Sequence, residues 1–98
     1  MPDAAAQNFK PGDIVAVRIA DPIGHVRTPR YIRGKSGVVE RYCGTYANPE
    51  ELAYARPGHP RQPLYRVRFI QHEVWPDYRG GPEDTIDLEI YQHWLEAK

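Results

Sequence analysis

Four short segments have the pattern of β-strands, and in two of them apolar and polar residues alternate with a two-residue period. Leu64–Phe69 alternates apolar and basic residues, and Thr85–Ile90 alternates apolar with polar or acidic residues. Ile14–Ile19 and Gly37–Tyr42 are rich in β-branched residues and follow glycine-containing turns. Short strands separated by Gly/Pro turns, with little helical pattern between them, predict a mainly β protein: a small, highly bent antiparallel barrel with short helical turns.

The segments outside these strands predict the domain bounds and one long loop. Residues 1–8 are expected to form a flexible leader, and residues 9–98 a single domain. Residues 43–63, rich in Gly, Pro, Asn and Tyr, are predicted to be one long loop. The tryptophan and leucine of Tyr91–Leu95 are expected to fill one end of the barrel.

The composition indicates the cellular compartment of the protein and whether the chain itself binds a metal. A single cysteine, Cys43, rules out an internal disulfide and suits a reducing cytoplasm, where we expect the protein to be found. The sequence has no apolar run long enough to cross a membrane. It also lacks a C-x-x-C or paired His/Cys motif, so we expect this chain to bind no metal and no other cofactor itself.

The formal net charge of zero hides an asymmetry along the chain. Residues 1–49 carry seven Lys/Arg and four Asp/Glu, a balance of +3. Residues 50–98 carry six and nine, a balance of −3. Nucleic-acid binding usually requires a basic excess over the whole domain, whereas a bipolar surface suits a specific protein partner.

One segment, residues 24–37, concentrates positive charge without any acidic side chain. Thr28 and Pro29 have the pattern of an N-cap and first helical position, and Gly34 that of a terminator, so a single helical turn is predicted. Arginines three residues apart on such a turn project from the same side. Paired guanidinium groups aimed outward can grip oxyanions, although a solvated basic loop is the alternative interpretation. The basic residues are His25, Arg27, Arg30, Arg33 and Lys35, while Tyr31 and Ile32 are expected to face the body of the protein.

Two families share parts of this sequence. The "GD.V.V" pattern at Gly12–Val17 and the "G..G.V" pattern at Gly34–Val39 are similar to the KOW module of ribosomal and transcription proteins. That pattern occurs in many SH3-like barrels, and here the basic turn enlarges its spacing.

A second resemblance covers residues 9 to 96. The chain resembles the C-terminal, SH3-like half of the nitrile hydratase β subunit in four ordered blocks. The blocks are "F.PGD.V.V" at Phe9–Val17, "GHVRTPRYIRGKSGV" at Gly24–Val38, "PLY.VRF...E.W" at Pro63–Trp75, and an acidic segment with a tryptophan at Asp84–Glu96.

This resemblance implies a function and a site. Nitrile hydratases add water to a nitrile to give an amide, using non-corrin cobalt or iron in an α subunit whose cysteine ligands are partly oxidised. In the family, the arginine before Gly-Lys contacts those oxidised cysteines, and Arg33 stands at that position. His25, Arg27, Arg30, Tyr31 and Lys35 are then expected to support Arg33 or contact the partner. His25 fits a place near the metal and a cap of its own loop equally well.

Two departures from the family pattern shape the expectation. The chain has no C-x-x-C-S-C loop, so it is not the metal-bearing subunit. It also lacks the helical N-terminal half of a full β subunit, which resembles the three-subunit layout of thiocyanate hydrolase and of the toyocamycin type of nitrile hydratase. We therefore expect a β-type subunit of a hetero-oligomer, with an α-type and an N-terminal β-type partner and a nitrile bound at their interface. The alternatives are a thiocyanate hydrolase subunit, a nitrile hydratase maturation or accessory protein, and a KOW-like RNA-binding module.

Overall fold

A five-stranded antiparallel sheet forms the framework of the molecule. The computed structural model describes residues 4–20, 27–52 and 60–98. The strand order in the sheet is β4-β3-β2-β1-β5. The bounds of the strands are Ile14–Val17 (β1), Ser36–Tyr46 (β2), Gln62–Ile70 (β3), Thr85–Tyr91 (β4) and Leu95–Ala97 (β5). The prediction of a mainly β, antiparallel fold is therefore confirmed.

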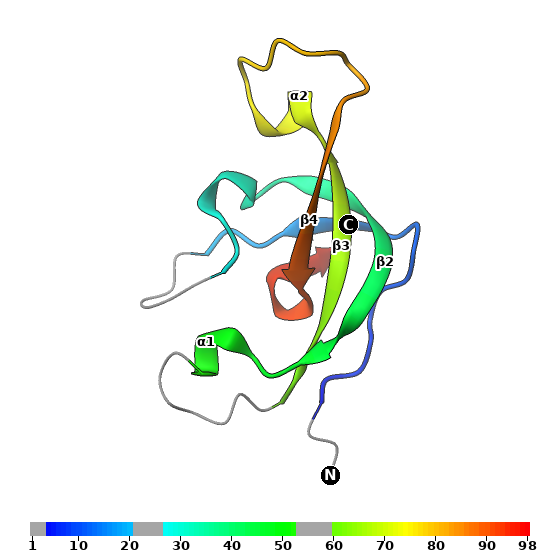
Figure 1. Cartoon of the computed structure of the whole chain (residues 1–98), viewed down its shortest axis with the longest axis vertical. Coiled ribbons are helices and arrows are strands. Elements are labelled where there is room, and N and C mark those ends of the chain that lie inside the picture. Colours follow the sequence, from blue (N-terminus) through cyan, green and yellow to red (C-terminus); the bar gives the residue numbers. More distant parts are fainter. Residues whose placement is uncertain (1–3, 21–26, 53–59) are drawn as a thin grey trace.

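The sheet is strongly curled, and β2 makes the curl possible. The first residues of β2 pair with β1, while the rest of β2 pairs with β3. As a result β1 crosses behind β3 and β4 (Figure 1). The 3-10 turn η2 (Gln92–Trp94) links β4 to β5, which pairs with β1. Within the described residues no ladder joins β4 to β5, so closure into a complete barrel is not observed.

The β2–β3 hairpin is longer than the sequence pattern predicted. The long loop expected at residues 43–63 is wrong at both ends, because β2 continues to Tyr46 and β3 begins at Gln62. The register shifts between Val39 and Arg41 and again between Tyr42 and Gly44. Such bulges break the two-residue period, which hides a strand from pattern reading. Between the two strands lies a short helix, α1 (Pro49–Leu52), whose Glu50 backbone N–H donates to Asn48 Oδ1 at 3.0 Å.

The observed bounds of the other elements differ less from the predicted ones. The first strand ends at Val17 rather than Ile19, and the backbone N–H of the next residue, Arg18, donates to the Trp94 carbonyl at 2.9 Å. A turn was predicted at His72–Trp75, and the structure has a one-turn helix, α2, at Gln71–Val74.

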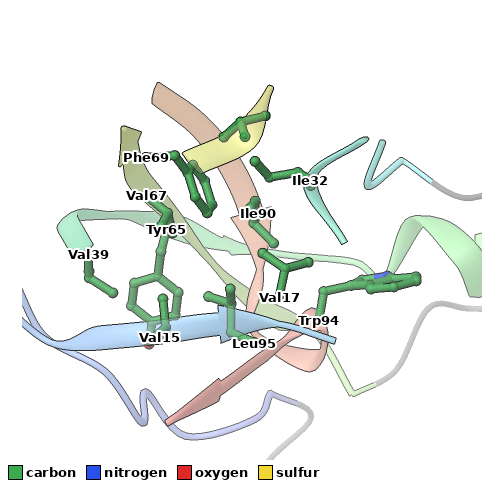
Figure 2. Packing of buried hydrophobic residues seen from close by; sticks show 11 residues of the cluster. Val15, Val17, Ile32, Val39, Tyr65, Val67, Phe69, Ile90, Trp94 and Leu95 are labelled. Carbon is green, nitrogen blue, oxygen red and sulfur yellow. The ribbon is translucent and has the colours of Figure 1, made fainter. Parts of the chain in front are cut away.

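The core lies inside the curl and receives side chains from every strand and both 3-10 turns (Figure 2). Trp94 and Leu95 are 3% and 6% exposed, so both belong to the core, and the expectation that they fill one end of a barrel remains a prediction. The burial of apolar side chains is the main stabilising contribution in a domain of this size. The members of the core are Val15, Val17, Ile32, Val39, Tyr65, Val67, Phe69, Val74, Ile90, Trp94 and Leu95.

A buried amide fastens the N-terminal segment to this core. The side-chain oxygen of Gln92 accepts from the Tyr65 hydroxyl at 2.8 Å and from the Asn8 backbone N–H at 2.9 Å. Its side-chain nitrogen donates to the Ala6 carbonyl at 2.7 Å. Burial of its hydroxyl raises the pKa of Tyr65. Residues 4–8 thus contact the domain, and the boundary drawn at Phe9 remains a prediction.

The packing of β2 on β3 generates a prediction at Gly37. A Cβ at this buried glycine would lie 2.7 Å from the Arg68 carbonyl oxygen and 2.9 Å from both Phe69 Cδ1 and Val67 Cγ1. We expect Gly37→Ala to lower the free energy of unfolding by about 1–3 kcal/mol, since the backbone has to shift. Urea unfolding measured by tryptophan fluorescence checks this value.

The matched control is Gly81→Ala, because a Cβ there meets only Asp84, at 3.4 Å or more. This change should stay within about 0.5 kcal/mol of the parent. Equal loss of stability in the two variants would contradict the close approach at Gly37.

Candidate functional site

The basic segment forms a tight turn that is hydrogen-bonded to β1. Its 3-10 turn, η1, spans Arg30–Ile32 with Arg33 as the C-cap residue, and Gly34 after it adopts φ +83°. The Gly34 backbone N–H donates to the Val17 carbonyl at 2.8 Å, and the Val17 N–H donates to the Lys35 carbonyl at 2.9 Å. Ile32 is fully buried beneath the turn. These contacts fix the backbone of the turn against the sheet.

The predicted cap of this turn is wrong. Pro29, not Thr28, is the N-cap residue, and no side chain caps the turn. Thr28 is instead 6% exposed, and its backbone carbonyl serves as a hydrogen-bond acceptor inside the turn. A 3-10 turn of three residues leaves little room for the N-cap geometry of an α-helix.

Tyr31 packs against the body of the protein on one face only. Its ring stacks on Trp75 with a centroid distance of 4.8 Å and an interplanar angle of 29°. The Trp75 indole N–H donates to Gln71 Oε1 at 2.8 Å, which fixes the ring that Tyr31 covers. Tyr31 nevertheless remains 37% exposed. The expectation that it faces inward is therefore met by one face of its ring, while part of the side chain lies at the surface.

Arg33 is held by backbone carbonyls and by an aromatic ring. Its Nη1 donates to the Ala20 carbonyl and its Nη2 to the Thr28 carbonyl, each at 2.8 Å. The guanidinium carbon lies 4.8 Å from the centroid of the Trp94 ring. A cation over an indole face is attracted by about 0.5–2 kcal/mol, the higher values applying where water is excluded. The half-buried guanidinium therefore has a defined position and plane.

The prediction that Arg30 and Arg33 project together is wrong. Arg30 is exposed, whereas the side chain of Arg33 turns back over Trp94. Helical spacing does not apply here because Arg33 follows η1 in extended backbone, at φ −63° and ψ 134°. Arg27 is also exposed and Lys35 is half-buried. His25 lies outside the described residues.

Two residues near the Trp94 ring, Glu50 and His93, were not predicted from the sequence to belong to the site. Glu50 of α1 accepts a hydrogen bond from the Trp94 indole N–H. His93 Nε2 lies 3.3 Å from the same carboxylate oxygen, though without hydrogen-bond geometry, and neither of its ring nitrogens has a hydrogen-bond partner in the described part of the chain. Only the fold brings α1 to η2, so no local pattern could have revealed this contact.

The described residues of the site include hydrogen-bond donors and aromatic side chains. In residues 4–20, 27–52 and 60–98, no group of three or more His, Cys, Asp or Glu side chains could hold a metal ion. None of the helices in these ranges is long and apolar enough to span a bilayer. The site instead presents one immobilised guanidinium and, around it, exposed cationic and aromatic side chains.

Comparison with known protein families shows to which family the chain belongs. The family "Nitrile hydratase beta subunit, C-terminal" matches residues 1–97. The chain belongs to this nitrile hydratase family. The resemblance seen in the sequence is therefore confirmed.

Relatives in this family are longer. The chain is 35% identical over 88 residues to the cobalt-containing nitrile hydratase subunit beta of Pseudonocardia thermophila, covering 90% of this chain and 37% of the relative. It is 34% identical over 88 residues to a nitrile hydratase subunit beta of Pseudomonas putida, covering 90% and 40%. The chain thus spans about two fifths of the length of these relatives.

A solved structure shares the whole fold. A chain of thiocyanate hydrolase from Thiobacillus thioparus, solved as the recombinant apo-enzyme, superposes with a TM-score of 0.90 at 27% identity. The match covers 98% of this chain and 80% of that chain.

The anchoring of Arg33 generates a stability prediction. Lysine cannot donate to two carbonyls from a planar fork, so Arg33→Lys should lose one of the hydrogen bonds and part of the contact with Trp94. We expect the free energy of unfolding to fall by about 1–2 kcal/mol, as measured by chemical denaturation.

The control is Arg41→Lys, at an exposed arginine of β2. It should change stability by less than about 0.5 kcal/mol. Identical unfolding midpoints for parent and Arg33→Lys would mean that these contacts do not hold the turn.

Proposed function

We propose that this chain acts as the β-type component of a nitrile hydratase, docking on a metal-bearing α-type subunit and directing Arg33 at its oxidised cysteine ligands. One observation carries the proposal: the Arg33 guanidinium is held in place by two backbone carbonyls and the Trp94 face. Family membership supports the reaction, the addition of water to a nitrile to give an amide.

The fixed guanidinium suits sulfur oxyanions. Cysteine sulfenate and sulfinate are oxidation states that further oxidation would destroy, and charge-assisted hydrogen bonds from a guanidinium satisfy their oxygens. A guanidinium presents five N–H donors in one plane, so it can serve acceptors on two sides of an interface. Because its position is set before docking, little ordering is needed when the partner binds.

The surroundings of Arg33 have the composition of a protein contact surface. Arg27 and Arg30 are exposed, and the stacked Tyr31 leaves part of its ring at the surface. Tyrosine and arginine are enriched where interfaces gain most of their binding energy. We assign these three residues, together with His25 and Lys35, to contact with the partners or support of Arg33.

The metal belongs to the partner in this proposal. Two relatives, from Pseudonocardia thermophila and Rhodococcus rhodochrous, are named as cobalt-containing nitrile hydratase subunits beta. We assign cobalt, or iron in its place, to an α-type chain, with an N-terminal β-type region completing the nitrile pocket. The metal would supply the Lewis acid that activates the nitrile or water.

Thiocyanate hydrolysis is the second candidate reaction. The observation that favours it is the TM-score of 0.90 with the thiocyanate hydrolase chain, of which this chain covers 80%. The same role for Arg33 would apply. Assaying the assembled complex with nitriles and with thiocyanate separates the two reactions.

Activity of the assembled enzyme tests the role of Arg33. With the α-type and N-terminal β-type partners co-expressed, Arg33→Lys should lower kcat by about 10²-fold, the loss expected when a preorganised donor to an oxyanion is removed. Parent and variant have to be compared at equal metal content and equal subunit stoichiometry, since failed assembly also removes activity.

Arg41→Lys is again the control and should leave kcat unchanged. Arg68 is less suitable, because it pairs with Asp87 and Glu40 at 2.9 Å and thereby lowers the pKa of Asp87. Full turnover and unaltered cysteine oxidation in correctly assembled Arg33→Lys enzyme would show that Arg33 serves docking only.

Salt dependence separates a protein partner from RNA. Phosphate contacts through the basic turn release counterions, so such binding weakens steeply as salt rises. We expect binding to RNA to disappear near physiological salt, while the complex with the α-type chain persists. Electrophoretic mobility shift and size-exclusion chromatography over a salt series measure the two. Salt-resistant, sequence-selective RNA binding would favour the KOW-like function instead.

A further inference from the structure

We infer that Glu50 and Trp94 act as positioning residues for Arg33, so that α1 helps to set the geometry of the basic turn. The inference rests on the proposed role of Arg33 and adds the means by which its guanidinium is oriented. Neither residue is assigned to contact substrate or metal.

Trp94 supplies the surface on which the guanidinium rests. The hydrogen bonds to the Ala20 and Thr28 carbonyls fix the position of the Arg33 Nη1 and Nη2 atoms. The Trp94 indole, 4.8 Å from the guanidinium carbon, fixes the orientation of the guanidinium plane. Trp94 is 3% exposed, and its backbone carbonyl accepts from the Arg18 N–H at 2.9 Å. The ring is packed within the core (Figure 2), and it also lies against the Arg33 guanidinium.

Glu50 fixes the orientation of that ring. An indole has a single polar atom, its N–H, and the Glu50 carboxylate accepts a hydrogen bond from it. Figure 2 shows the Trp94 ring extending toward the ribbon of α1. A charged acceptor makes this hydrogen bond stronger than a neutral one would, so rotation of the ring away from Arg33 is disfavoured.

The placement of Glu50 is itself determined by neighbouring contacts. Its backbone N–H is held by the Asn48 side chain at 3.0 Å, and His93 Nε2 lies 3.3 Å from its carboxylate. The side chains of Glu50 and His93 are 25% and 21% exposed. Asn48, Glu50, Trp94 and Arg33 thus form a continuous series of contacts from the β2–β3 connection to the basic turn.

Three variants test this inference in the assembled enzyme at equal metal content and stoichiometry. Glu50→Ala should lower kcat by about tenfold, the lower end of the effect of residues that orient a functional group. Glu50→Gln keeps an oxygen acceptor for the indole N–H and should restore most of the activity. Glu83→Ala removes an exposed carboxylate of the α2–β4 connection and should match the parent.

The double variant shows whether Glu50 acts through Arg33. If it does, adding Glu50→Ala to Arg33→Lys should lower kcat no further, because the group being positioned is already lost. Additive losses would overturn the inference, as would parent activity in Glu50→Ala. If Arg33→Lys alone retained full activity, the proposed function of Arg33 would fail as well, and the two failures are thereby distinguished.

NMR of the chain by itself supplies a readout independent of assembly. The Arg33 side-chain resonances should be shifted by the Trp94 ring current, and Glu50→Ala should move them toward unperturbed values while Glu50→Gln does not. Arg33 resonances identical in the parent and Glu50→Ala would overturn the inference even if the variant failed to assemble.

Discussion

The close approach of β2 to β3 at Gly37 is the constraint on which the rest of the structure depends. The adjacent β2 residue Val38 pairs with both Ile14 of β1 and Arg68 of β3, so β2 belongs to both halves of the curled sheet. A side chain at Gly37 would occupy the space of Phe69 and Val67, which are both core residues. Glycine permits such a backbone approach, and the sheet can then enclose its own inner face.

The core also holds the basic turn and the Arg33 side chain in place. Ile32 is buried in it and holds the basic turn, and Trp94 is buried in it and supports Arg33. The core that stabilises the fold thus also determines where the Arg33 guanidinium lies. Sites supported by rigid elements and packed side chains hold their geometry more precisely than sites on loops alone.

The sequence predicted what local chemistry determines and missed what tertiary contacts determine. Alternation located β3 and β4, and Gly34 correctly marked the end of the basic turn. Pattern reading failed at the bulges of β2, where the two-residue period is interrupted. It also failed for the direction of the Arg33 side chain, because the attracting surface, Trp94, is 61 residues away in the sequence. The family resemblance pointed to Arg33 as a candidate, and its contacts with Ala20, Thr28 and Trp94 become visible only in the three-dimensional structure.

The pairing of β1 with β5 has a consequence for biosynthesis. Val15–Val17 is made well before its partner Leu95–Ala97, and the core is incomplete until Trp94 and Leu95 have been made. Contacts between such distant segments form slowly, because a long stretch of chain has to be closed into a loop first. While the ribosome is still synthesising β5, the nascent chain therefore exposes apolar surface, and this domain completes its folding only after β5 has been made.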